Sequence, residues 1–162
     1  MISDISQKKV GHIIRALNVD TPLSQRWSTD PWFQRDQVWD LSRKQKLVDS
    51  LKRGMPVGMV WTWTHDTDGI SRTDIIDGKQ RCTTLASFKA GLFRDGDGDL
   101  WSEWTELEQF KFGERQIAVQ GVTLEDGETN ELVVELFRRI NTQSKKLTPG
   151  QLLKSCYEDD TM

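Results

Sequence analysis

The chain has 162 residues and a mass of 18.7 kDa, which is enough for one domain with a buried core. Its 36% hydrophobic and 29% charged residues are typical of a globular protein, and its net charge of −3 excludes a broadly basic, sequence-independent DNA coat. No apolar run reaches the roughly 18 residues of a membrane span, and residues 1–12 lack the apolar stretch of a signal peptide, so we expect a cytoplasmic protein.

The N-terminal segment is the least regular part of the sequence. Residues 1–30 are polar and are predicted to form an extension to a domain that spans residues 31–162. One weak apolar cluster within the extension indicates a short helix, and its members are Ile13, Ile14 and Leu17.

Residues 42–53 are predicted to form the first long helix. An apolar stripe runs along it, formed by Leu47, Val48 and Leu51. Ser42 and Gln45 have the spacing of a capping box at its start, and Gly54 stands where a C-cap is expected.

A strand pair and a second helix are expected next. The predicted segments are, in order, a strand at 60–64, a turn at 65–71, a strand at 73–76 and a helix at 81–91. Trp61 and Trp63 are two positions apart in the first strand and therefore lie on one of its faces.

The second half of the chain begins with an acidic, glycine-rich loop. The predicted segments are this loop at 93–104, short strands around Phe110 and Phe112 and at 117–122, a helix at 130–140, and a last helix that begins at Thr148. Asp95, Asp97 and Asp99 imitate part of a calcium-loop spacing, but Leu100 stands where that loop needs glycine, which favours an acidic turn. The alternation of strands and helices predicts an α+β fold with a small mixed sheet.

Residues 77–81, Asp-Gly-Lys-Gln-Arg, are the candidate site. They lie where a strand ends and a helix begins, so unpaired backbone N–H groups and the helix dipole favour an anion there. Gly78 permits a tight turn and the close approach of a ligand, and Lys79 and Arg81 add positive charge. Asp77 either caps the helix or holds a water molecule or Mg²⁺ beside phosphates. The alternative interpretation is an ordinary capped surface helix.

The surroundings of this turn carry further motifs. Gln34-Arg35 precedes the first long helix, IIDGKQRCTTLASF spans residues 75–88, and FRRIN spans residues 137–141. Together these motifs resemble the N-terminal domain of GmrSD-type modification-dependent restriction proteins, which belongs to the ParB/sulfiredoxin-like superfamily. The resemblance covers residues 31–153, and it departs from the family's aspartate-glycine-glutamine-glutamine-arginine turn only at Lys79. The ParB signature is matched by Gly78, Arg81 and Thr84, where threonine replaces alanine.

The resemblance implies both a fold and a function. It implies a ParB/sulfiredoxin-like mixed sheet flanked by helices, and a domain that binds and hydrolyses a nucleoside triphosphate to control DNA restriction. Catalytic roles would fall to Asp77, Gln80 and Arg81. Nucleotide-binding roles would fall to Gln34, Arg35, Gly78, Lys79, Arg81, Arg139 and Asn141. The nucleotide would bind alone or with Mg²⁺, and DNA would be reached directly or through a fused or separate nuclease. We expect substitution of Arg81 by alanine to abolish nucleotide binding with little effect on thermal stability.

Two other functions are weighed against this one. The first is a non-enzymatic ParB-like module that binds DNA or a protein. The second is a nuclease, which would depend on carboxylates such as Asp74 and Asp77, because two cysteines and two histidines are too few for a metal centre of those residues. Sulfiredoxin chemistry is excluded, since Lys79 stands where that enzyme has its cysteine and Cys82 is expected to face inward.

Two further features are open to more than one interpretation. The basic stretch at residues 138–146 either approaches phosphates or complements the end of its own helix. Seven tryptophans suit a core, but those near loops are candidates for base stacking, with Trp39 as the best placed.

Overall fold

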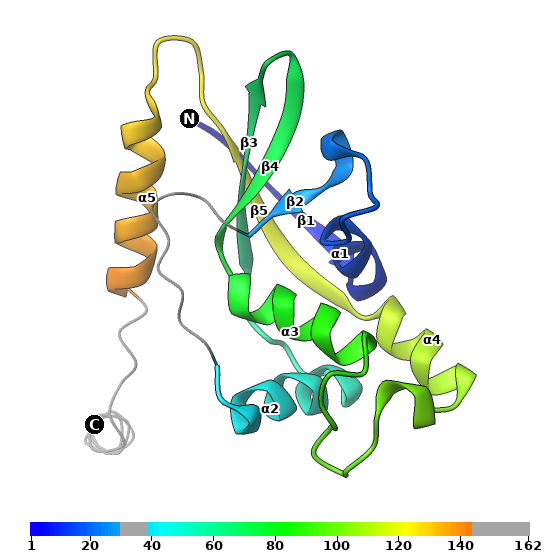
Figure 1. Cartoon of the computed structure of the whole chain (residues 1–162). Coiled ribbons are helices and arrows are strands. Elements are labelled where there is room, and N and C mark those ends of the chain that lie inside the picture. The colour runs from blue at the N-terminus through cyan, green and yellow to red at the C-terminus, as the bar shows by residue number, and fades with distance from the viewer. Residues whose placement is uncertain (30–38, 144–162) are drawn as a thin grey trace, which may run out of the picture. The chain divides into compact units, whose positions relative to one another are not determined.

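The computed structural model describes residues 1–29 and 39–143 (Figure 1). Its contacts divide the chain into two compact units, Met1–Asn130 and Glu131–Met162, which are described separately below. Among the described residues, no helix combines the length and the apolar character needed to cross a membrane.

The first unit contains a five-stranded mixed sheet with the strand order β1-β5-β3-β4-β2 (Figure 1). The strands are β1 (Ile2–Lys9), β2 (Trp27–Ser28), β3 (Val60–Thr67), β4 (Ile70–Asp77) and β5 (Gln116–Thr123). β1 pairs with β5 and β3 with β4 in antiparallel fashion, whereas β3 pairs with β5 and β2 with β4 in parallel. The predicted α+β class with a small mixed sheet is confirmed.

The core lies between this sheet and four helices. The helices are α1 (Val10–Ala16), α2 (Leu41–Lys52), α3 (Lys79–Lys89) and α4 (Glu106–Glu114), with short 3₁₀ turns η1 (Leu23–Gln25) and η2 (Trp101–Glu103). The most buried core side chains are Val10, Ile13, Val48, Val60, Ile75, Cys82, Leu85 and Phe88. The amphipathic helix α5 (Asn130–Gln143) confirms the prediction at 130–140, and all but its first residue belongs to the second unit.

The first 29 residues form part of the sheet and the core, rather than an extension. β1 pairs with β5 along its whole length, from Ile2 opposite Thr123 to Lys9 opposite Gln116. The expected short helix is α1, which supplies Ile13 to the core. The sequence pattern concealed β1 because a strand at the edge of a sheet is fixed by backbone pairing and needs no regular apolar alternation.

Helix α2 confirms the prediction at residues 42–53, but a different residue caps it. The Asp40 carboxylate accepts a hydrogen bond of 2.9 Å from the backbone N–H of Arg43, so Asp40 rather than Ser42 is the N-cap. At the other end Gly54 has a φ of +77° and follows the helix, as predicted.

The β3–β4 hairpin is longer than the sequence predicted. Residues 65–71 were expected to form a turn, but β3 continues to Thr67 and β4 begins at Ile70. The turn is limited to Asp68 and Gly69, which have φ values of 53° and 75°. Positive φ at both central residues is the geometry of the tight hairpin turns that Asp-Gly favours.

A β-bulge near the end of β4 changes which side chains share a face. Trp61 pairs with Asp77 while the next residue, Thr62, pairs with Ile75, so β4 carries one extra residue. Paired residues lie on the same face of a sheet. Asp77 therefore shares a face with Asp74, which pairs with Trp63, although an odd spacing of three in a regular strand would separate them.

The prediction of a strand around Phe110 and Phe112 is wrong, because these residues lie in helix α4. Thr105 and Glu108 form a capping box, in which the backbone N–H of Glu108 donates to the Thr105 hydroxyl and the backbone N–H of Thr105 donates to the Glu108 carboxylate. A spacing of two places the rings on different sides of a helix. Phe112 is accordingly buried and Phe110 is exposed.

The acidic loop is organised around a buried carboxylate. One oxygen of Asp95 accepts hydrogen bonds from the backbone N–H groups of Asp97 at 3.0 Å and Asp99 at 2.9 Å, and the other accepts from the Trp104 indole at 3.0 Å. Burial alone would raise the pKa of Asp95, but these donors and the nearby charge of Lys52 outweigh burial and lower it. The loop is thus an acidic turn that is held together by hydrogen bonds to the buried Asp95 carboxylate.

Replacement of Asp95 by asparagine should cost about 1–3 kcal/mol of unfolding free energy at neutral pH, because buried donors lose a charged acceptor. Because folding lowers the pKa of Asp95, the ionised carboxylate contributes its full stabilisation at pH values above about 4, the pKa of an aspartate in the unfolded chain. This contribution is lost as the pH falls through the lowered pKa of the folded state. The difference between wild type and variant in urea unfolding, followed by tryptophan fluorescence, should therefore shrink below about pH 4. Asp97→Asn, at a side chain that is 74% exposed, is the control and should change stability by less than about 0.5 kcal/mol. Equal effects of the two substitutions would contradict this role of Asp95.

Candidate functional site

The turn between β4 and α3 is built around Gly78. This residue has a φ of +102° and is the N-cap of α3, and it provides no side chain to cap the helix. A Cβ atom at Gly78 would lie 2.9 Å from a methyl carbon of Val60, closer than real Cβ contacts come. Glycine is therefore required both by the backbone conformation and by the packing of the turn on β3.

The Arg81 side chain is bound within the protein. Its guanidinium donates to the backbone carbonyl of Val57 at 3.0 Å, to that of Met59 at 2.8 Å and to the Asp77 carboxylate at 3.3 Å. The side chain is 17% exposed, and three of its five N–H groups are used by these bonds. The expectation that Arg81 points at an external anion and contributes little to stability therefore needs correction. Arg81 ties residues 57–59 to the first turn of α3.

Gly58 leaves the space that this arrangement needs. Its φ is +88°, and a Cβ atom there would collide with Nη1 of Arg81. Pro56 and Gly58, which precede β3, indicate a loop in the sequence, but the backbone carbonyls that bind Arg81 were not predicted. Carbonyl groups are present at every residue, so only the folded chain shows which ones converge.

Gln80 connects the turn to Trp39. The side-chain oxygen of Gln80 accepts a hydrogen bond of 3.1 Å from the backbone N–H of Trp39. Because a backbone N–H can only donate, this bond identifies the oxygen of the Gln80 amide, and the other polar group of the side chain is the NH₂ donor. The Arg43 guanidinium lies over the Trp39 ring at 5.2 Å, so Trp39 is beside the turn but one face of its ring is already covered.

The carboxylates near the turn differ in their surroundings. Asp77 is half-buried and uses one oxygen for Arg81, and no described residue donates a hydrogen bond to the other oxygen. Asp74 accepts from His65 Nε2 at 2.8 Å, and the ring of His65 stacks on Trp63. Over residues 1–29 and 39–143, no three histidine, cysteine, aspartate or glutamate side chains gather into a possible metal site.

The remaining predicted site residues are Gln34, Arg35, Arg139 and Asn141. Gln34 and Arg35 lie outside the described residues. Arg139 and Asn141 are on α5 in the second unit, where Arg139 pairs with Glu135 at 2.8 Å and Asn141 donates to the carbonyl of Phe137. Their proposed role in the same pocket stays a prediction.

Cys82 faces inward, as predicted. It is fully buried in the core on α3, and burial raises the pKa of its thiol to about 12. A thiol with such a pKa is protonated at neutral pH, which makes it a poor nucleophile.

The fold and the turn define a small α+β domain in which a mixed sheet leads into a helix through a glycine without a side-chain cap. The family described as GmrSD restriction endonuclease, N-terminal domain, matches residues 19–121, and the chain belongs to this family. The match includes the turn at 77–81 and the helices α2 and α3, so the chain is a domain of the restriction or phage-defence type, a class of protein that involves DNA. Neither a curated protein nor a solved structure matches the chain.

Proposed function

We propose that this domain binds a nucleoside triphosphate at the start of α3 and hydrolyses it to regulate DNA restriction. The observation that carries the proposal is the Gly78 turn, which opens the helix Lys79–Lys89 without a side-chain cap. The first backbone N–H groups of such a helix and its dipole attract phosphate. A glycine lets phosphate oxygens approach the backbone closely.

The structure changes the roles that side chains take in this proposal. Because Arg81 is held internally, it supports the turn, while Lys79 places a positive charge at the first residue of α3 and Gln80 carries an NH₂ group that can donate. Asp77 is the carboxylate that fits a Mg²⁺ ion, because Mg²⁺ with a nucleotide needs only one or two carboxylates beside phosphate oxygens. Bound Mg²⁺ would neutralise charge on the phosphates, while Asp77 would fix its position.

Two observations favour a second candidate function, a non-enzymatic ParB-like module. The Arg81 guanidinium is already paired with Asp77, and the Gln80 oxygen is occupied by Trp39. Neither group is then free to stabilise charge on a transferring phosphoryl group or to accept a proton from water. Such a module would bind DNA or a protein and would not hydrolyse a nucleotide.

A thermal-shift panel with ATP, GTP, CTP and UTP, each with and without Mg²⁺, tests the proposal. A nucleotide that binds only the folded state at about 100 times its Kd stabilises the protein by about 2.7 kcal/mol and raises its Tm. Phosphate release measured in parallel separates the two candidates. Binding with release supports the enzyme, binding without release contradicts hydrolysis, and no shift with any nucleotide contradicts the enzyme and favours the module.

Lys79→Gln is the most informative variant, because it restores the family's own motif at residues 77–81. It removes one cation, and we expect nucleotide affinity to fall roughly fivefold, the effect of about 1 kcal/mol for a unit charge at about 4 Å in water. Lys46→Gln, at an exposed position of α2, is the matched control and should leave affinity unchanged. An equal loss in both variants would show that only the overall charge matters.

A further inference from the structure

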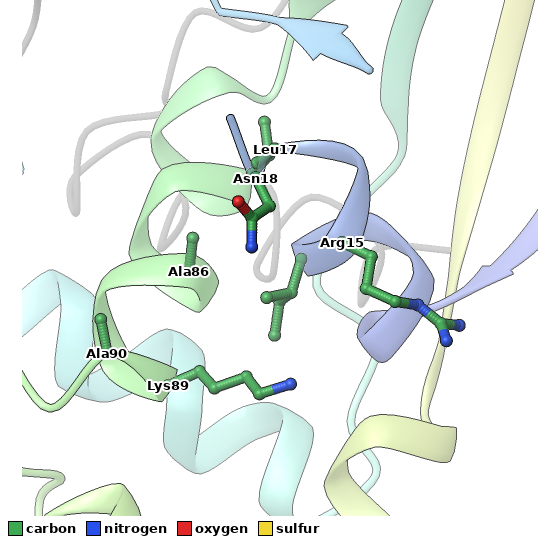
Figure 2. A pocket seen from close by; sticks show the side chains of 7 residues that line it. Arg15, Leu17, Asn18, Ala86, Lys89 and Ala90 are labelled. Carbon is green, nitrogen blue, oxygen red and sulfur yellow. The ribbon is translucent and has the colours of Figure 1, made fainter. Parts of the chain in front are cut away.

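Two adjoining hollows lie around α1, far from the candidate nucleotide site. One is formed between α1 and α3, has a volume of about 290 Å³ and is lined by Ile14, Arg15, Leu17, Asn18, Ala86, Lys89 and Ala90 (Figure 2). The other has a volume of about 230 Å³ and continues onto α4, where it is lined by Gln109, Phe110 and Gly113. Arg15 and Lys89 line both hollows. We call the lining of the two hollows the α1 surface.

The α1 surface is basic in a chain whose net charge is −3. Lys9, His12, Arg15 and Lys89 line it, and among its described lining residues the only acid is Glu114, which pairs with Lys9 at 2.8 Å. Among the described residues, neither Arg15 nor Lys89 has an ion-pair partner. The acidic residues that give the chain its negative charge must therefore lie elsewhere.

Helix dipoles explain only part of this charge distribution. Arg15 and Lys89 are in the last turns of α1 and α3, where a cation is favourable. Lys9, however, is the N-cap of α1 and His12 is in its first turn, where a cation is unfavourable. Burial, Lys8 and Arg15 together lower the pKa of His12, and the last two causes report a positive local potential.

The shape and the apolar groups of the α1 surface indicate the kind of polyanion that fits. Ala86 and Ala90 on α3 and Leu17, the C-cap of α1, line the first hollow, so it presents alkyl groups as well as charges (Figure 2). Phe110 borders the second hollow and is 65% exposed. A basic groove beside an exposed aromatic ring is the combination that binds single strands, since only an unpaired base can stack on a side chain.

We propose that the α1 surface binds single-stranded DNA, with phosphates held by Arg15 and Lys89 and an unpaired base stacked on Phe110. The family acts in DNA restriction, but its match begins at residue 19, so α1 lies outside the residues that define the family. Lys89 lies ten residues beyond Lys79 on α3, which separates the two sites by about 15 Å along the helix. DNA and nucleotide would therefore occupy opposite ends of one helix.

Fluorescence anisotropy with a labelled single-stranded oligonucleotide of mixed sequence tests this inference, with the same sequence as a duplex for comparison. We expect tighter binding of the single strand, and an affinity that falls steeply between about 50 and 200 mM salt. Arg15→Glu with Lys89→Glu should weaken binding by about tenfold or more and reduce the salt slope by roughly 0.7 for each phosphate that the protein no longer neutralises. Phe110→Ala should weaken single-strand binding by roughly fivefold or more and leave duplex binding unchanged.

A second pair of charge reversals is the matched control. Lys46→Glu on α2 with Arg53→Glu at its C-cap makes the same change in net charge, at exposed residues that line neither hollow. This control should retain DNA binding, and circular dichroism with Tm measurements should show that both double variants are folded. No binding by the wild type, equal losses in both double variants, or tighter binding of the duplex would each overturn the proposal. Thermal shifts with nucleotides measure the other site, so failure of one proposal is distinguishable from failure of the other.

Discussion

Replacing Arg81 with alanine is expected to lower the free energy of unfolding by about 3 kcal/mol, because a charged donor is removed from two backbone carbonyls and a carboxylate. The loop at residues 57–59 then loses its attachment to α3, and the Asp77 carboxylate loses its partner. Urea unfolding followed by circular dichroism measures the change. Arg81→Lys keeps the charge but cannot reach the same acceptors with one planar group, so we expect an intermediate loss.

Arg53→Ala is the matched control for this prediction. Arg53 pairs with Asp49 four residues earlier at 3.2 Å, the same spacing that separates Arg81 from Asp77, but it is 64% exposed. An exposed pair of this kind contributes about 0–1 kcal/mol. If Arg81→Ala proved as mild as Arg53→Ala while nucleotide binding disappeared, Arg81 would be a ligand-binding residue and its role in holding the loop at residues 57–59 would be wrong.

Replacing Gly78 with alanine should produce the second large effect. The positive φ of +102° costs an L-residue about 1–2 kcal/mol, and the new methyl group would overlap Val60 at 2.9 Å, which adds about 1–3 kcal/mol. Relief of the overlap requires the turn to move away from β3. We therefore expect lower stability and, in conditions where the variant is folded, loss of the thermal shift with nucleotide.

Gly69→Ala separates the two causes of this effect. Gly69 also has a positive φ of +75°, but a Cβ atom there would meet nothing within 4 Å. The control should show only the backbone cost of about 1–2 kcal/mol and should leave any nucleotide response intact. If both substitutions cost the same, the close packing of Gly78 on Val60 has no energetic importance.

The predictions at Asp95 and at Arg81 share a physical cause. In both cases a charged side chain satisfies polar groups that the folded chain cannot expose to water. Substitutions at exposed residues of the same type are mild because water replaces the lost partner. The matched pairs therefore test burial and partner geometry, with residue type held constant.

Local sequence patterns were sufficient for most of the helices and for three of the strands, β3, β4 and β5. The stripe of Leu47 and Val48, and the apolar face of the helix at 130–140, have the helical period, so their prediction depends only on neighbours along the chain. The β-forming run at Val60 and the end of β4 at Asp77 were found for the same reason. Periodicity was misleading at Phe110, where a capping box at Thr105 outweighed a spacing that suits a strand.

By itself, the sequence determined the α+β class, the position of the turn at residues 77–81 and the resemblance to the family that the chain proved to match. The fold class, the turn and the family resemblance depend on residue types at short spacing along the chain, which can be seen in the sequence. Only the tertiary structure decided that β1 belongs to the sheet and that Arg81 binds the carbonyls of residues 57–59. Nearly every residue has the same backbone N–H and C=O groups. Which of these groups bond to each other therefore depends on how the whole chain packs, and no single residue type in the sequence indicates it.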